Sequence, residues 1–196
     1  MTARSAFARH ALPALLLLPS LALALAGCTA SHVQARRAEH PEAKPAALAL
    51  EPLRFQDRLW EPLGPHFERG LRERLSEEQA FAEIFSPPPQ PLGPSAVLLS
   101  GTITEVDKGS AALRYLVGFG AGKQKVAGTF RLLDPGGRTL AEFDAEESYM
   151  GGAGIGGISF LDMEDLMRKF GRRVAERVIR WSRGLPLAEE EPERPK

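Results

Sequence analysis

Apolar and polar residues alternate through much of the second half of the chain, and this pattern is typical of strands with one buried face. Segments 97–106, 123–133 and 139–146 show the alternation most clearly, and segment 112–119 is also β-rich. Residues 134–137, DPGG, have the composition of a tight turn. We therefore predict a run of adjacent strands joined by short turns.

The first half of the chain carries a weaker pattern. Apolar residues spaced by four, beginning at Phe67, predict a helix over 65–79. Short apolar segments at 47–53 and 81–85 predict two strands on either side of it. The proline-rich segment 86–94 can support neither a helix nor a strand ladder, so we expect a loop there.

A longer helix is predicted over 160–181, close to the C-terminus. Ser159 is the expected N-cap residue, and Asp162 three residues later would complete a capping box. The helix carries an apolar stripe that could bind a partner, but packing against the sheet is the interpretation we favour. The stripe comprises Met163, Met167, Phe170, Val174, Val178 and Trp181.

These elements predict an α+β fold in which two helices pack on one face of a mostly antiparallel sheet. We expect a single domain over residues 47–184. Residues 28–46 lack apolar periodicity and contain two prolines, so they are expected to form a flexible tether. Residues 185–196 are charged and proline-containing, and are expected to form a disordered tail.

The N-terminus has the pattern of a targeting signal. Two arginines precede an apolar run over residues 11–26, which is short for a membrane-spanning helix. The run ends in Leu-Ala-Gly27-Cys28, which resembles the lipobox of bacterial lipoproteins. That resemblance implies removal of a signal peptide, residues 1–27, by cleavage between Gly27 and Cys28, and acylation of Cys28. The alternative is an ordinary secretory signal whose cleavage site adjoins a cysteine.

Composition excludes several functional classes. Among the 196 residues, 25 basic side chains balance 25 acidic ones, so an electrostatic nucleic-acid binder is not expected. The hydrophobic content of 43% argues against a wholly disordered chain. Cys28 is the sole cysteine, and His66 is the sole histidine of the predicted domain. We therefore expect no catalytic triad, no metal site, no cofactor and no enzyme activity.

Two glycine-rich segments invite a ligand-binding interpretation. Residues 117–124, VGFGAGKQ, fall short of a phosphate loop in spacing and lack its hydroxyl residue, so a hairpin turn is favoured. Residues 152–157, GAGIGG, match a dinucleotide fingerprint but lack its parallel-strand context, so a flexible crossover is favoured. The candidate interaction or ligand-loop residues are Gly118, Phe119, Gly120, Gly122, Gly152, Gly154 and Gly157.

Three carboxylates, Glu142, Asp144 and Glu146, share one face of a predicted strand. Paired carboxylates can act as acid and base, but a solvated face with cross-strand ion pairs is the favoured interpretation. The expected basic partners are Arg114, Lys123, Lys125 and Arg131.

Segments 99–105, LSGTITE, and 114–123, RYLVGFGAGK, together with LLD at 132–134, resemble a family of uncharacterised bacterial lipoproteins, the domain of unknown function 4410. The resemblance extends over residues 53–181. It implies a small α+β domain in the cell envelope and supplies no catalytic residues. The order of elements is also similar, more distantly, to periplasmic domains of envelope lipoproteins such as the curli secretion lipoprotein.

The sequence thus predicts a lipid-anchored envelope protein that contacts the membrane through its lipid and binds a protein partner as an interaction or assembly module. Thr29 after the cysteine favours the outer membrane, with the domain facing the periplasm. The alternative is a periplasmic lipoprotein that binds a small ligand or anion through its glycine-rich loops.

The lipid anchor is directly testable by Cys28→Ser. Because this substitution removes the sulfur that would carry the lipid, we expect the protein to move from the membrane fraction to the soluble periplasmic fraction. Fractionation with immunoblotting measures the change. Full retention of the variant in the membrane fraction would contradict the anchor.

Overall fold

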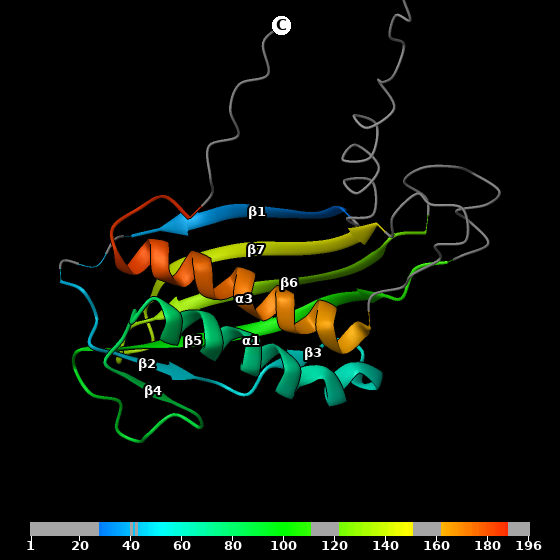
Figure 1. Ribbon diagram of the computed structural model, residues 1–196. Helices are drawn as coiled ribbons and strands as arrows, with labels where there is room; N and C mark the ends of the chain where they lie inside the picture. Colours follow the sequence, from blue (N-terminus) through cyan, green and yellow to red (C-terminus); the bar gives the residue numbers. More distant parts are fainter. Residues whose placement is uncertain (1–27, 40, 42, 111–121, 151–161, 188–196) are drawn as a thin grey trace, which may run out of the picture.

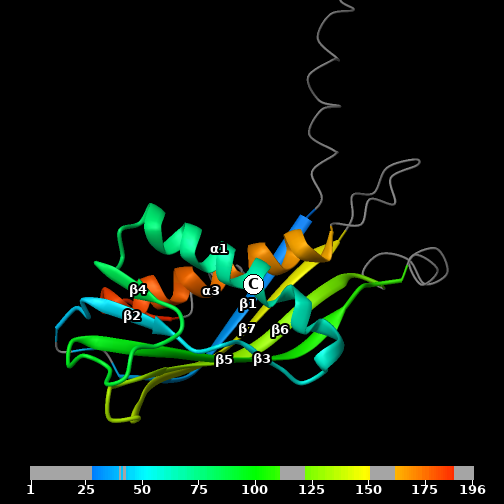
Figure 2. The ribbon, with the colours of Figure 1, turned by 90° about the horizontal axis from the view of Figure 1, so that it is seen from below.

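The computed structural model describes residues 28–39, 41, 43–110, 122–150 and 162–187. These residues form one seven-stranded sheet with two α-helices packed on one of its faces (Figures 1 and 2). The other face, called the open face below, has no helix over it among the described residues. The predicted strand at 112–119 and the signal peptide lie outside the described residues.

The strands vary from two to twelve residues in length. They are β1 Cys28–Ala38, β2 Ala47–Leu50, β3 Arg54–Phe55, β4 Glu83–Phe85, β5 Ala96–Asp107, β6 Gln124–Leu133 and β7 Thr139–Met150. The helices are the 3-10 helix η2 Arg58–Leu63, α1 Gly64–Glu77 and α3 Met163–Ser182.

The α+β class predicted from the sequence is confirmed; the sheet is mixed rather than purely antiparallel, with its long pairings antiparallel and three short pairings parallel. Its order is β1-β7-β6-β5-β2-β4, and β3 pairs with β5 beside β2. Strand β2 is parallel to both β4 and β5. The reason is the connection: α1 lies between β2 and β4, so the chain crosses over the sheet and returns in the same direction.

The expected tether over residues 28–46 is wrong for its first part. Residues Cys28–Ala38 form β1, which pairs antiparallel with β7 from Cys28 opposite Met150 to Ala38 opposite Ala141. Val33 is buried at 9% exposure. An edge strand satisfies its backbone through one neighbour and needs few apolar side chains, so the segment has no alternating signal.

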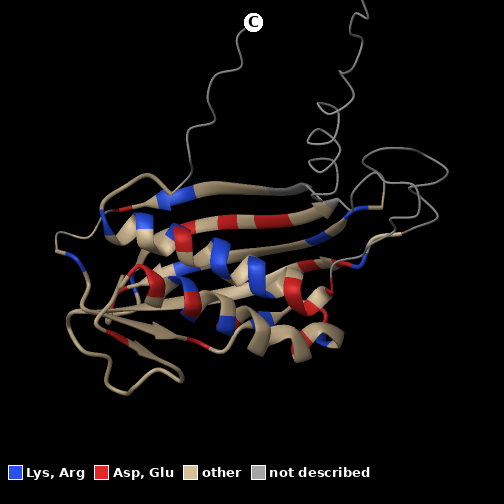
Figure 3. Ribbon diagram, viewed as in Figure 1, with Lys and Arg blue, Asp and Glu red and all other residues tan. Residues whose placement is uncertain are grey.

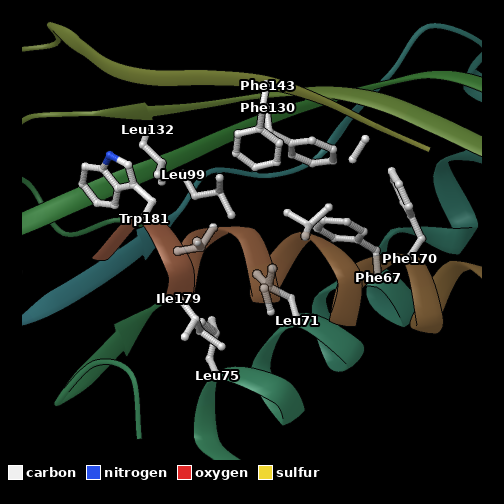
Figure 4. Packing of buried hydrophobic residues seen from close by; sticks show 14 of the residues in the cluster. Phe67, Leu71, Leu75, Leu99, Phe130, Leu132, Phe143, Phe170, Ile179 and Trp181 are labelled. Atoms are coloured by element: carbon white, nitrogen blue, oxygen red, sulfur yellow. The ribbon is translucent and has the colours of Figure 1, made fainter. Parts of the chain in front are cut away.

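Four phenylalanines form the centre of the core between the sheet and the helices (Figure 4). The Phe130 ring stacks on Phe67 from α1, with centroids 5.7 Å apart, and on Phe143 from β7 at 5.6 Å. Phe170 of α3 tilts onto Phe130 at 5.8 Å. Each buried ring removes about 150–250 Å² from water, so this cluster joins both helices to the central strands.

Helices α1 and α3 approach so closely that glycine is required at the crossing. A Cβ atom on Gly70 would lie 2.0 Å from the carbonyl oxygen of Arg168, and one on Gly171 would lie 2.1 Å from that of Phe67. Both contacts are with backbone, which cannot rotate away. The two helices therefore pack backbone to backbone at both of these positions.

The predicted apolar stripe of α3 faces the core as expected, since Met167, Phe170 and Val174 are fully buried. The helix begins at Met163 rather than at the predicted residue 160. Asp162 is the N-cap residue, and its carboxylate accepts a hydrogen bond from the Glu164 backbone N–H at 3.1 Å. The predicted cap, Ser159, lies outside the described residues.

Residues 185–187, which the sequence assigned to a disordered tail, are part of the folded domain. Leu187 is buried at 1% exposure, and its carbonyl oxygen accepts a hydrogen bond from Arg177 at 3.2 Å. The Pro186 carbonyl accepts another from Arg180 at 2.7 Å. Residues 185–187 therefore close the C-terminal end of α3 and belong to the domain, while 188–196 lie outside the described residues.

The helix crossing yields a stability prediction. Gly171→Ala forces the two helices apart, so we expect a loss of about 1–3 kcal/mol or more in the free energy of unfolding. Chemical denaturation followed by circular dichroism measures it. Gly93→Ala is the matched control, because a Cβ at Gly93 meets nothing within 4 Å. Equal stability of Gly171→Ala and Gly93→Ala would contradict the close crossing.

Candidate functional site

The end of the sheet at which β1 begins brings together the features that the sequence singled out. We call it the Cys28 end. A register row crosses four strands there, with Ala30 opposite Ser148, Ser148 opposite Lys125, and Lys125 opposite Asp107. Neighbouring strands lie about 4.8 Å apart, so β1 and β5 are separated by about 14 Å along this row. In Figure 1 the same end contains η2 and the start of α3.

An open groove of about 550 Å³ lies at the Cys28 end, between η2, the end of β5 and the start of α3. Its middle is bridged by the Gln124 amide, which donates to the Met163 sulfur at 3.5 Å. On one wall the Lys108 ammonium lies 4.9 Å from the centre of the Trp60 ring, in a cation–π contact. The lining residues are Trp60, Leu63, Lys108, Gly109, Gln124, Asp162, Met163 and Glu164.

Only one of the predicted glycine-loop residues falls among the described residues. Gly122 has φ +72°, and a Cβ there would lie 2.2 Å from the Ser110 carbonyl oxygen, so the position requires glycine. Its carbonyl accepts a hydrogen bond from the Ser110 N–H at 3.3 Å. The other predicted residues lie outside the described residues: Gly27, Gly118, Phe119, Gly120, Gly152, Gly154 and Gly157.

The groove nevertheless lies beside the described flanks of both glycine-rich segments. Gly109 precedes the first segment, Gln124 is its last residue, and Asp162 follows the second segment. The charges of its described lining are one ammonium, Lys108, against the carboxylates of Asp162 and Glu164. Glu164 also lies 3.5 Å from the His66 Nε2. This lining offers an anion little net attraction.

The acidic residues that the sequence placed on one strand face point to the open face, because the residues that alternate with them on β7 are buried in the core, and they form ion pairs. Figure 3 marks these acidic positions along β7 in red. Glu142 pairs with Arg131 at 3.2 Å, and Glu146 pairs with Lys125 at 3.1 Å, so the predicted cross-strand pairing is confirmed for these residues. Strand β1 adds an unexpected partner, because Arg36 bonds to Asp144 at 2.7 Å. Lys123 also pairs with Glu146 at 3.3 Å. Arg114 lies outside the described residues.

Adjacent glutamates on β7 have opposite pKa shifts because their side chains point to opposite faces. Burial against α3 raises the pKa of Glu147, and the charge of Arg173, 3.5 Å away, only partly offsets it. The pKa of Glu146 lies below its usual value. Partial burial opposes this shift, but hydrogen bonds and charge from Lys125 and Lys123 outweigh the effect of burial.

Within the described ranges, no three or more His, Cys, Asp and Glu side chains gather closely enough to hold a metal ion. No helix among the described residues combines the length and the hydrophobicity needed to cross a bilayer.

The residues that sequence reasoning missed are Leu59 and Trp60 on η2. Leu59 is 71% exposed, the largest value among the exposed large hydrophobic residues in the described part of the chain. Asp57 caps this helix by accepting a hydrogen bond from the Leu59 N–H at 3.0 Å. Asp57, a residue type that commonly caps helices, was the one sign of η2 in the sequence. A 3-10 helix of six residues is too short to show an apolar periodicity.

The family resemblance predicted from the sequence is confirmed over residues 62–153, which match the model of a Domain of unknown function (DUF4410). No curated protein matches the sequence.

Several solved structures are similar at low identity. The PelC dodecamer from Paraburkholderia phytofirmans is 15% identical with a TM-score of 0.46, covering 74% of this chain and 94% of that chain. A minor lipoprotein from Acinetobacter baumannii is 13% identical with a TM-score of 0.41, covering 71% and 94%. Lipoprotein GNA1162 from Neisseria meningitidis is 15% identical with a TM-score of 0.40, covering 68% and 98%.

The two β7 glutamates predict opposite pH dependence. A raised folded-state pKa means that Glu147 contributes stability below its ordinary pKa, and this contribution is lost as pH rises through the folded value. Glu147→Gln is therefore expected to raise the free energy of unfolding at pH 7 relative to the native protein, more than at pH 4. Denaturant titrations at both pH values measure it.

Glu146→Gln serves as the control of opposite sign. Because the pKa of Glu146 is lowered, its contribution is present above its ordinary pKa and is lost as pH falls. This variant is expected to be less stable than the native protein at pH 7 and closer to it at pH 4. The same direction of change in both variants would contradict the assignment of these side chains to opposite environments.

Proposed function

We propose that this chain, whose residues 62–153 match the domain of unknown function 4410, is a bacterial envelope lipoprotein, anchored through Cys28, that binds another envelope protein. Its domain faces the periplasm from the outer membrane. The observation that carries the proposal is the position of Cys28: the residue that would bear the lipid is the first residue of the edge strand β1. The anchor therefore lies at one end of an extended strand whose outer edge has no neighbour among the described strands.

The two halves of β1 differ in their ability to accept a further strand. The second half contains a bulge at Arg36, since Ala35 pairs with Phe143 and Arg37 pairs with Glu142. Bulges and charged side chains are the devices by which natural sheets block edge pairing. The first half, residues 28–34 with the sequence CTASHVQ, is regular and carries no acid or Lys or Arg. It is the part of the edge suited to strand addition.

The geometry favours a strand of another protein over a second copy of this chain. Antiparallel pairing of two β1 strands would place their Cys28 residues at opposite ends of the joined sheet. Two lipids on one membrane surface require both cysteines at the same end. A partner strand without an anchor meets no such restriction, so we assign the docking edge to a different envelope protein.

The charges of the open face support this choice of edge. Arg36, Arg131 and Lys125 are all engaged with carboxylates of β7. Exposed pairs of this kind contribute little to stability, but they neutralise one another and leave no large field to attract a charged partner. Recognition through backbone hydrogen bonds at the β1 edge does not need such a field.

Site-specific photo-crosslinking in intact cells tests the docking edge. A crosslinking amino acid at Gln34, which is exposed on the regular half of β1, is expected to give a discrete adduct with an envelope protein. The same amino acid at Ala38, exposed beyond the bulge, is the matched control and is expected to give little or none. The two sites share one strand, so the anchor and the fold are unchanged between them.

A second variant tests the recognition mode. Gln34→Pro removes one backbone donor from the strand, and Ala38→Pro removes one beyond the bulge. Adducts read from a crosslinker at His32 should fall in Gln34→Pro and persist in Ala38→Pro. Equal adducts at Gln34 and Ala38, or adducts unaffected by either proline, would contradict docking at this edge.

A further inference from the structure

We infer that the Cys28 end of the sheet lies directly against the bilayer, with Leu59 and Trp60 of η2 entering its interfacial zone as a second contact beside the lipid. This inference rests on the proposed anchor at Cys28. The occupant is a zwitterionic phospholipid surface. The contact would fix the orientation of the domain, which a lipid alone leaves free.

The first observation is that no spacer separates the anchor from the fold. Cys28 itself pairs with Met150 at the end of β7. A chain of about 18 residues acting as a flexible tether would hold a domain roughly 20–25 Å from the membrane. Pairing from the first residue instead brings the end of the sheet to the depth of the lipid headgroups.

The second observation is that η2 lies at the same end, across the sheet from the anchor. Trp60 lines the groove with Lys108 and Gln124, and Gln124 pairs with Tyr149, which pairs with Thr29. The lipid at β1 and the apolar side chains of η2 thus lie at the same end of the sheet. They are separated across its width, because β1 is an edge strand and η2 contacts β3, which pairs with β5. Two contacts separated in this way resist tilting, and β1 then runs away from the membrane for about 36 Å.

The third observation is the chemistry of η2. Leu59 is 71% exposed, and the half-buried Trp60 has a polar N–H on an apolar ring. Tryptophan is enriched where a membrane meets water because its ring suits both phases. The carboxylates of Asp57 and Glu61 are balanced by the guanidinium of Arg58, which lies 3.1 Å from Glu61, and by the ammonium of Lys108 over the Trp60 ring. These four charges sum to zero, so they give anionic headgroups no advantage. The surface therefore fits zwitterionic lipid.

The chain carries its own reporter and internal control for this contact. Its two tryptophans are Trp60, at the Cys28 end, and Trp181, which is fully buried and donates to the Glu39 carbonyl at 2.8 Å. Trp181 lies eighteen residues after Met163, about 27 Å further along the α3 axis. A quencher in the acyl chains should therefore reach Trp60 and not Trp181.

The experiment uses the lipidated mature protein in phosphatidylcholine vesicles with brominated acyl chains. Tryptophan emission is expected to fall relative to unbrominated vesicles, and the fall should disappear in Trp60→Phe, which retains Trp181. Leu59→Asp should lower the ratio of inserted to free η2 by about tenfold or more, since burial of a leucine is lost. Leu185→Asp, at a second large hydrophobic residue that is exposed in the described part of the chain, is the matched control and should leave quenching unchanged.

Flotation of the same vesicles separates failure of the inference from failure of the anchor. A lipidated chain that does not float with the vesicles would contradict the proposed anchor itself. A chain that floats, yet shows the same emission in brominated and unbrominated vesicles, would overturn the membrane contact while leaving the anchor intact. Quenching that persists in Trp60→Phe would also overturn it.

Discussion

The pairing of β1 with β7 is the constraint on which the arrangement of this protein depends. It continues the sheet from the aromatic core to its edge and brings Arg36 beside Asp144 on the open face. It also converts the residues next to Cys28 from a linker into part of the domain. Without this pairing, a lipid at Cys28 would hold the domain loosely. With it, the proposed anchor at Cys28 would determine which end of the sheet approaches the membrane, and the regular half of β1 would be the proposed binding edge.

The two faces of the sheet solve different physical problems. The covered face packs against α1 and α3 through stacked phenylalanines, and the two helices cross closely where Gly70 faces the backbone of α3 and Gly171 faces the backbone of α1. The open face replaces apolar burial with cross-strand ion pairs, whose partners compensate one another. Glu146 and Glu147 are adjacent in sequence yet differ in the direction of their pKa shifts, because one faces ammonium groups in partial solvent and the other lies beneath a helix. The face, rather than the residue type, determines the electrostatic environment.

Much of this fold follows from the sequence wherever a buried face repeats. The alternation around Phe130 and Phe143 predicted β6 and β7, and the stripe around Phe170 predicted α3 and its packing. The parallel pairing of β2 was missed, because a four-residue strand does not encode its direction. β1 was missed because its stability comes from backbone hydrogen bonds and one buried valine. Of the candidate site, the charged strand face was predicted correctly, while Trp60 was not, since only the folded chain brings η2 to the Cys28 end.

The structure places Cys28 at the start of an ordered strand, Cys28–Ala38, with no flexible linker between Cys28 and that strand. Hydrogen–deuterium exchange of the lipidated full-length protein, resolved to the peptide covering residues 29–35, tests it most directly. We expect the amides of this segment that are bonded to β7 to exchange far more slowly than those of an unstructured chain, although faster than the amides of β6 at the centre of the sheet. Exchange of the whole segment at the unstructured rate would contradict an ordered β1, because Cys28 would then be joined to the domain by a flexible tether.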